Sequence, residues 1–291
     1  MNRRSFIQSL SFAGFVPELL RQQLQANMSL LTSDDALLCS RKFERAVSAK
    51  LQKRPIKEVI IEIGKTFLGT TYVANTLEVP GEERLVVNLR GLDCVTFYEN
   101  SLVLARCVKK SKKTFDDYKA ELQFIRYRGG IINGYPSRLH YTSDYIYDNE
   151  KKGVWKDVAK DIGIPFVKTI NFMSAHPDSY RQVKENPEFA KIIAEQEREI
   201  TKREKFYIPK NYIDKIANKI ESGDILGVTT DLEGLDVSHT GIAIWHKSKL
   251  RFLHAPNVGH KVAITEKTLA EYVAGNKQQT GIMVARPLEP R

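Results

Sequence analysis

One stretch of this chain constrains its fold more than any other: residues 90–105, which read R-G-L-D-C-V-T-F-Y-E-N-S-L-V-L-A. Gly91 permits a sharp turn, and Asp93 is a residue type that caps the first turn of a helix. The apolar residues that follow recur on more than one side of a helix. The stretch therefore predicts a buried helix that begins at Cys94, directly after a turn.

The position of Cys94 in this stretch has a chemical consequence. A thiol in the first turn of a helix feels the positive end of the helix dipole, which favours the thiolate, and the thiolate attacks carbonyl carbon. Cys94 is therefore a candidate nucleophile. The alternative is that it is a small buried residue, as free cysteines usually are, and this stretch alone supports both interpretations.

The last third of the chain is rich in strand signals. Strands are expected at residues 222–230, 237–245 and 250–256, and the H-K-S-K sequence between the last two predicts a tight turn. His239 and His254 are nearly equidistant from that turn, so they are expected to face each other across an antiparallel hairpin. With Cys94 they fit a nucleophile, a histidine base and a polar group that orients the base.

Residues 135–145, Y-P-S-R-L-H-Y-T-S-D-Y, show neither helical nor strand periodicity. Their hydrogen-bonding and aromatic side chains, Arg138, His140, Tyr141 and Asp144 among them, are typical of the wall of a binding cleft. A polar surface loop is the alternative. Tyr72, in a loop at residues 68–78, is by itself most simply a packing residue.

The rest of the chain predicts shorter elements. The patterns indicate a helix capped by Ser33, Asp34 or Asp35, a strand at 84–89, a helix at 115–127, strands within 155–173, a solvated helix that starts at Pro187 after the cap Asn186, a helix at 268–273 and a strand at 281–286.

Composition bounds the class of protein. With 42% hydrophobic and 27% charged residues, the chain is an ordinary globular protein, and its formal charge of +10 suits an anionic setting such as a cell wall. No zinc knuckle or aromatic RNA-binding signature appears, so a nucleic-acid partner is not expected. Three cysteines are too few for a disulfide framework, and Cys39 and Cys107 are expected in the core.

The N-terminus, M-N-R-R-S-F-I-Q-S-L-S-F-A-G-F, pairs two arginines with a short apolar run. Residues 1–30 are therefore expected to be an export signal of the twin-arginine kind, or an amphipathic N-terminal helix. The expected location is the periplasm or cell envelope. No run approaches the ~20 apolar residues that span a bilayer, so no transmembrane segment is expected.

Several of these motifs together resemble the papain-like bacterial cell-wall hydrolases of the NlpC class. They are G-T-T-Y, L-D-C-V-T-F, S-G-D-I, S-H-T-G-I-A-I and F-L-H-A-P, in that order over residues 68–286. Three further stretches, R-L-H-Y-T-S-D, I-N-F-M and G-L-D-V-S-H, resemble the subgroup described as N-acetylmuramoyl-L-alanine amidase-like. One departure is V-A-N-T after Tyr72, where the wider class has a tryptophan and paired glycines.

The resemblance implies an α+β, papain-like fold in which the nucleophile helix packs on a small antiparallel sheet. Residues 31–291 would form one domain, with a subgroup insertion at about residues 129–210. Cys94 would be the nucleophile, His239 the general base and then acid, and His254 the residue that fixes the tautomer of His239. Tyr72 would lie beside the nucleophile, and the backbone at Asp93 and Cys94 would help to bind the oxyanion.

The implied function is a cysteine amidase that hydrolyses the bond between N-acetylmuramic acid and L-alanine in peptidoglycan or muropeptides, with no cofactor. A D-glutamyl endopeptidase of the stem peptide is the alternative within the class. Two other classes stay open: a zinc hydrolase that uses Cys94, His239 and His254 as ligands, and a wall-binding protein without activity. Oligomeric state has no signal in the sequence.

Overall fold

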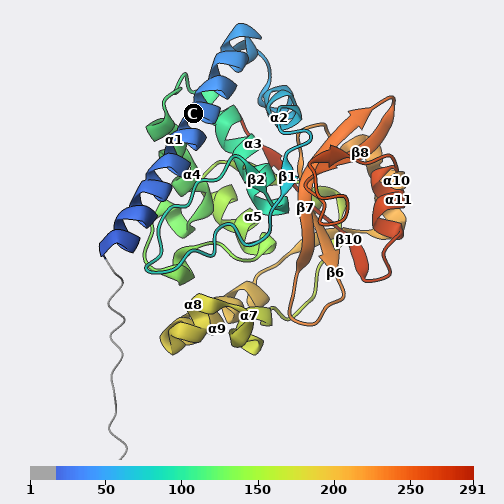
Figure 1. The fold of residues 1–291 in the computed structure, drawn as a ribbon. Helices are drawn as coiled ribbons and strands as arrows, with labels where there is room; N and C mark the ends of the chain where they lie inside the picture. Colours follow the sequence, from blue (N-terminus) through green and yellow to red (C-terminus); the bar gives the residue numbers. More distant parts are fainter. Residues whose placement is uncertain (1–17) are drawn as a thin grey trace, which may run out of the picture.

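Strands from the last third of the chain build the sheet around which the protein folds (Figure 1). The computed structural model describes residues 18–291. The main sheet has the strand order β4-β5-β10-β6-β7-β8-β9, with β3 beside β10, and its pairs are antiparallel. The strands are β1 (Thr71–Tyr72), β2 (Gly91–Leu92), β3 (Trp155–Asp157), β4 (Ile164–Pro165), β5 (Phe206–Pro209), β6 (Ile225–Thr230), β7 (Val237–His246), β8 (Lys249–His254), β9 (Ala263–Ile264) and β10 (Gln279–Pro287).

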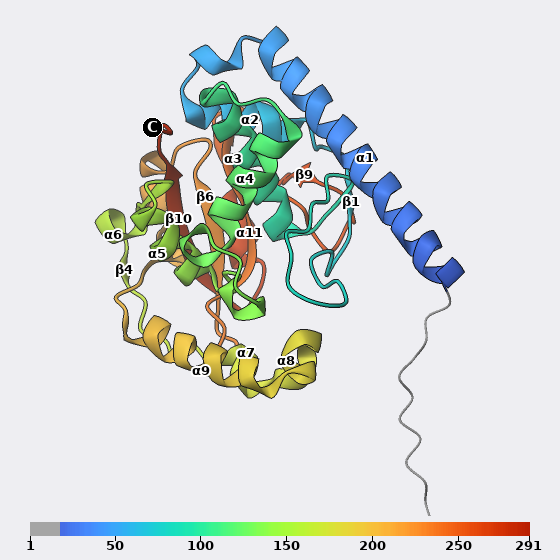
Figure 2. The ribbon, with the colours of Figure 1, turned by 90° about the vertical axis from the view of Figure 1, so that its left-hand side faces the viewer.

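Helices cover both faces of this sheet (Figures 1 and 2). Helices α2, α3 and α4 lie on one face, and α10 and α11 lie on the other. The helices are α1 (Glu18–Ser48), α2 (Ile56–Lys65), α3 (Cys94–Lys109), α4 (Phe115–Arg126), α5 (Thr142–Lys151), α6 (Ala159–Ile162), α7 (Phe172–Ala175), α8 (Arg181–Glu185), α9 (Pro187–Lys202), α10 (Ile213–Ile216) and α11 (Leu269–Ala274). The predicted α+β class is therefore confirmed.

The residues of β7 alternate between the two faces, as a strand buried on both sides requires. Ile242 and Ile244 belong to the core shared with α2 and α3, whereas Ala243 belongs to the core shared with α11. The middle of β7 is thus buried on both faces of the sheet.

Helix α3 begins at Cys94, as the sequence predicted. The Asp93 carboxylate accepts from the Thr96 backbone N–H at 2.7 Å, and the Thr96 hydroxyl accepts from the Asp93 N–H at 2.9 Å. This capping box satisfies two donors of the first turn. Residues 96–108 of the helix are buried on all sides, so α3 is a fixed support for the residue at its N-terminus.

The predicted hairpin is also present. Lys247 and Ser248 have φ values of 51° and 59°, the left-handed conformation of a two-residue turn between antiparallel strands. The register pairs Ile242 with Leu253, so His239 and His254 are diagonal neighbours on one face of the sheet. The sequence had predicted that they face each other across the hairpin, and the structure places them on the same face but not directly opposite.

Four local predictions are wrong. Ser33, Asp34 and Asp35 lie inside α1 and do not cap it, and residues 84–89 form no strand. Helix α5 begins at Thr142, inside the predicted irregular segment, and the stretch 155–173 contains α6 and α7 as well as β3 and β4. The shared reason is that side-chain contacts from distant residues, and not local periodicity, decide these segments.

The other predicted elements are confirmed as α4, α9, α11 and β10. Helix α9 is less solvated than expected, because Ile193, Glu197 and Ile200 are buried in a cluster with Tyr135 and Tyr141. That cluster lies within the segment 129–210 that was predicted as an insertion. Residues 1–17 of the expected export signal lie outside the described residues, and no described helix is long and apolar enough to cross a membrane.

Candidate active site

Cys94 is partly buried where α3 meets strand β7. The Thr240 hydroxyl and backbone N–H lie close enough to the sulfur to lower the pKa of Cys94 against the effect of burial, and the buried Thr240 Oγ1 makes no hydrogen bond among the described residues. Thr240 follows His239 directly in the chain, so the thiol approaches the strand at the residue next to the predicted base.

Strand β7 has a β-bulge at Ser238, directly before His239. Val228 pairs with His239 and Thr229 pairs with Val237, which leaves Ser238 as an extra residue immediately before the histidine. Bulges of this kind bend a strand and change the direction of its side chains. The local backbone geometry therefore sets the orientation of His239.

The two histidines are joined by a direct hydrogen bond. His239 Nε2 lies 2.7 Å from His254 Nδ1, with the ring planes at 80° to each other. The rings pack on Phe252, whose centroid lies 5.6 Å from that of His239 and 4.7 Å from that of His254. This packing restricts the orientation of both imidazoles. His239 Nδ1 makes no hydrogen bond to another described residue.

Tyr272, on α11, connects the thiol and the histidines. Its ring centroid lies 6.3 Å from that of His239 and 5.2 Å from that of His254. Burial raises the pKa of Tyr272, and the charge of a Cys94 thiolate raises it further. The same two causes raise the pKa of Tyr72, so the predicted loop tyrosine does lie near Cys94.

The protonation states differ from the sequence prediction. Burial, with a smaller contribution from the Asp93 charge, raises the pKa of Cys94 to about 11. Burial lowers the pKa of His239 to about 4 and that of His254 to about 3. Burial thus opposes the effect of the helix N-terminus, and it favours a neutral thiol and a neutral imidazole.

The backbone donors at the start of α3 also differ from the prediction. The Asp93 N–H is already bound to Thr96, so it is not free for an oxyanion. The N–H groups of Cys94 and Val95 have no acceptor among the described residues, and they lie at the positive end of α3. These two groups are the available donors for a developing negative charge.

The four predicted residues of the cleft wall make internal contacts. Arg138 pairs with Glu78 and Glu83, each at 2.7 Å, and the Tyr141 hydroxyl donates to Glu197 at 2.5 Å. Asp144 pairs with Arg128 and Arg203, and His140 packs on Tyr135 at 4.6 Å. None of the contacts of these four described residues reaches Cys94, His239 or His254. A direct contact with substrate stays a prediction.

The sequence analysis did not predict that Thr240 and Tyr272 lie at the site. Thr240 had a signal, because it stands beside the histidine in S-H-T-G. Tyr272 had none, since its position depends on how α11 packs on the sheet.

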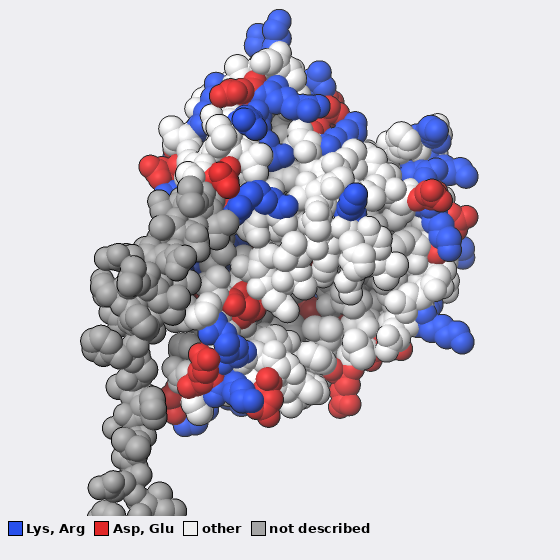
Figure 3. Space-filling model, in the orientation of Figure 1, with Lys and Arg blue, Asp and Glu red and all other residues white. Residues whose placement is uncertain are grey.

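The face of the molecule over β1, β7 and β8 shows few charged side chains, so the net positive charge lies mainly elsewhere (Figure 3).

The zinc alternative finds no ready set of ligands. Among residues 18–291, no three His, Cys, Asp or Glu side chains gather as a metal site. His239 Nε2 and His254 Nδ1 face each other as hydrogen-bond partners, so one nitrogen carries the shared proton, the other accepts it, and neither is directed at an ion.

Known proteins share the sequence pattern and the fold of this chain. A family model described as AmiA-like, N-acetylmuramoyl-L-alanine amidase-like, matches residues 62–282. The curated proteins include no match. The crystal structure of an N-acetylmuramoyl-L-alanine amidase from Bacteroides uniformis is 34% identical, with a TM-score of 0.77 over 80% of this chain and 98% of its own.

Two further solved structures share the fold. A Bacteroides fragilis protein, named provisionally as a xylanase, is 38% identical, with a TM-score of 0.72 over 77% of this chain and 98% of its own. A Legionella pneumophila protein is 21% identical, with a TM-score of 0.68 over 89% of this chain and 96% of its own. From the matched residues and these identities, the chain belongs to the AmiA-like family of N-acetylmuramoyl-L-alanine amidase-like proteins.

Proposed function

We propose that this protein is a cysteine amidase that hydrolyses the amide between N-acetylmuramic acid and L-alanine in peptidoglycan or muropeptides, within the wider papain-like NlpC class. The family and the Bacteroides uniformis amidase support the bond class. The cysteine mechanism rests on one observation, the 2.7 Å hydrogen bond between His239 Nε2 and His254 Nδ1.

That hydrogen bond selects the base. When His239 Nε2 donates to His254 Nδ1, the lone pair of His239 lies on Nδ1, which is then able to take a proton. The low pKa of His254 keeps its ring neutral, and in the tautomer with the proton on Nε2 its Nδ1 accepts from His239. Because the acceptor is fixed in place, His254 also stabilises the imidazolium that forms when His239 takes the proton from the thiol.

The acylation step follows from these groups. The Cys94 sulfur bonds to the carbonyl carbon of the lactyl group while its proton passes to His239 Nδ1. The Cys94 and Val95 N–H groups stabilise the oxyanion of the tetrahedral intermediate. The intermediate collapses to a thioester, the carbon–nitrogen bond breaks, and His239 returns the proton to the departing alanine nitrogen.

Deacylation uses the same residues in reverse. His239 Nδ1 takes a proton from water, whose oxygen bonds to the thioester carbon, and the sulfur leaves as the thiol after it receives the proton. The products are a muramic acid with a free lactyl carboxylate and a peptide with a free alanine amine.

The D-glutamyl endopeptidase uses the same thiol chemistry and differs only in the bond cleaved, so it is the second candidate. The provisional xylanase name of one relative is a weaker guide. Glycoside hydrolysis ordinarily needs two carboxyl groups on either side of the scissile bond, whereas a thiol and two histidines suit acyl transfer.

Digestion of defined muropeptides tests the proposal. A disaccharide tetrapeptide and the sugar-free stem tripeptide are incubated with the protein, and the products are weighed by mass spectrometry. The disaccharide tetrapeptide should release a peptide with free alanine, the tripeptide should stay intact, and a chelator should not change the rate. Efficient cleavage of the tripeptide after D-glutamate would establish the endopeptidase instead.

Labelling with iodoacetamide separates an enzyme from an inactive wall-binding protein. Cys39 and Cys107 are completely buried, so Cys94 should react first and its reaction should abolish turnover.

Export to the cell envelope stays part of the proposal. It predicts that a reporter fused after residue 30 is found outside the cytoplasm, and that Arg3→Lys with Arg4→Lys prevents this.

A further inference from the structure

Residues 73–90 connect Tyr72 to the strand and turn that precede Cys94, and they contain no helix or strand. Connections longer than about 12–15 residues without regular structure are uncommon in compact domains, and they usually serve a function. The first residue of this loop is tied down, because the Val73 N–H donates to the Leu92 carbonyl at 3.1 Å. The loop therefore starts and ends beside the nucleophile.

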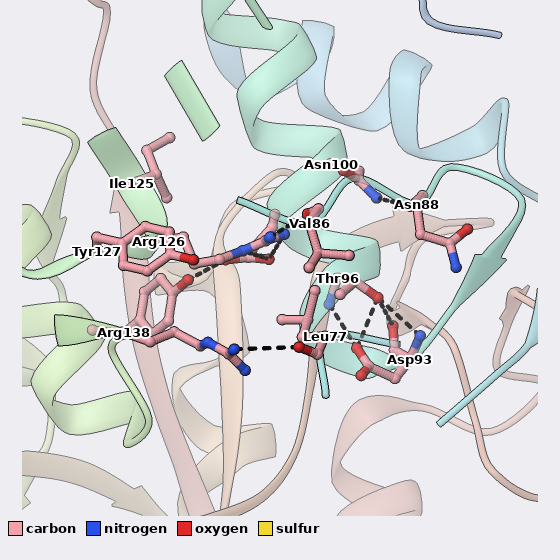
Figure 4. A network of polar contacts seen from close by, with 12 residues as sticks. Leu77, Val86, Asn88, Asp93, Thr96, Asn100, Ile125, Arg126, Tyr127 and Arg138 are labelled. Atoms are coloured by element: carbon pink, nitrogen blue, oxygen red, sulfur yellow. Dashed lines mark hydrogen bonds and ion pairs between the residues drawn. The ribbon is translucent and has the colours of Figure 1, made fainter. Parts of the chain in front are cut away.

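Buried side chains hold the rest of the loop by its backbone carbonyls (Figure 4). Arg126 donates to the Val86 carbonyl at 2.6 Å, and Asn100 donates to the Asn88 carbonyl at 3.0 Å. The Tyr127 hydroxyl lies 2.6 Å from the Glu83 carboxylate and 3.1 Å from the Arg84 carbonyl, both of which accept from it. These contacts replace the ladder of a strand, which is why leucines and valines at 84–89 do not form one.

Arg138 makes the most extensive of these contacts, and it comes from the segment 129–210. Its guanidinium donates to the Leu77 carbonyl at 3.2 Å and pairs with Glu78 and Glu83, both of them loop residues. The side chains of Arg138 and Glu83 are 6% and 2% exposed. A buried charge is costly without its partner, so any movement of the loop that separates Glu83 from Arg138 is unfavourable.

We propose that Arg138 is a positioning residue: it holds residues 73–90 as one wall of the substrate cleft, so that the segment 129–210 acts on substrate through this loop. The inference rests on the proposed amidase function. It assigns Arg138 a different role from the direct substrate contact that the sequence predicted.

The test removes the ion pairs without leaving a buried charge alone. The clamp variant combines Arg138→Met with Glu78→Gln and Glu83→Gln, and the matched control combines Arg106→Met with Glu121→Gln. Arg106 is as buried as Arg138 and binds Glu121 at 2.6 Å, but it touches no residue of the loop. Arg138→Lys is a third variant that restores the charge without the planar fork.

The first readout is amide hydrogen exchange without substrate. Exchange at residues 73–90 should rise about 10-fold in the clamp variant and stay unchanged in the control, because local opening becomes easier only where contacts are lost. The second readout is kinetic: KM should rise about 10-fold while kcat changes less than about 3-fold, and Arg138→Lys should lie between. The iodoacetamide rate at Cys94 should not change.

Unchanged exchange in the clamp variant would overturn the proposal, and so would faster exchange with an unchanged KM, since the loop would then be no wall of the cleft. Equal effects in clamp and control variants would also overturn it. If the unaltered protein cleaved no muramoyl-alanine bond at all, the proposed function would fail, while hydrogen exchange would still report whether Arg138 holds the loop.

Discussion

The hairpin of β7 and β8 and the loop at residues 73–90 both lie near Cys94, the candidate nucleophile, and different interactions hold them. The hairpin is held by a ladder of backbone hydrogen bonds and a two-residue turn. The loop is held by buried arginine, tyrosine and asparagine side chains that bind its carbonyls. A ladder distributes its stability over many equivalent bonds, whereas the loop depends on a few charged groups that are costly to lose.

The largest effect is expected at the residue between the two regions. Cys94→Ala should abolish turnover, because no other group can form the acyl intermediate, and it should leave the far-UV spectrum and the loop exchange unchanged. Mass spectrometry of muropeptide products checks the first point. Cys107→Ala is the control, since it creates a small buried cavity and should cost stability but not activity. Activity retained in Cys94→Ala would disprove the mechanism.

Arg126→Met tests the loop side of the comparison. It leaves Glu99, which is completely buried, without its partner, so the free energy of unfolding in urea should fall by about 3–5 kcal/mol. Lys65→Met breaks an exposed ion pair with Glu62 and should cost less than about 0.5 kcal/mol. A loss below 1 kcal/mol for Arg126→Met would show that the loop does not depend on buried charge.

Thr240→Val tests the hairpin side. The variant keeps the shape of the side chain but removes the hydroxyl that lowers the pKa of Cys94 by stabilising the thiolate, so alkylation at fixed pH should slow by about 10-fold. Thr240→Ser should restore the rate. Thr229→Val, at a buried threonine of β6 whose hydroxyl binds Thr280, is the matched control and should leave alkylation unchanged.

A smaller change is expected from pH. The active form has a neutral Cys94 thiol and a neutral His239, so kcat/KM should vary little between the pKa values of about 4 and about 11. It should fall in acid as His239 gains a proton and can no longer accept one. It should fall in alkali as the thiol loses the proton that the leaving amine needs. A narrow optimum with both limbs near neutrality would favour a preformed thiolate and imidazolium pair.

The smallest effect concerns the turn of the hairpin. Lys247→Asn with Ser248→Gly places the preferred residues at two positive φ angles and should raise the free energy of unfolding by about 0.5–1 kcal/mol. Lys249→Asn, at the first residue of β8, is the control. A destabilised variant would mean that the hairpin depends on side chains of the turn, as the loop depends on its arginines.

The comparison also explains which parts were predictable. Helix α3 with its Asp93 cap, the hairpin and the pairing of His239 with His254 follow from patterns within about 20 residues, because capping and strand pairing are local and periodic. The diagonal offset of the histidines was not predictable, since the turn is centred on Lys247 and Ser248, one position later than the midpoint of the two histidines.

The sequence by itself therefore determined the candidate nucleophile, the candidate base and its proposed orienting partner, and the α+β class. Only the tertiary structure decided the loop at residues 73–90, the neutral state of the thiol and imidazole, and the places of Thr240 and Tyr272. The physical reason is that burial and ion pairing arise between residues far apart in the chain: Arg138 and Glu83 meet across 55 positions. No periodic pattern in the sequence carries that information. The same holds for the pKa values of Cys94 and His239, because they depend on burial by residues that are distant in the chain.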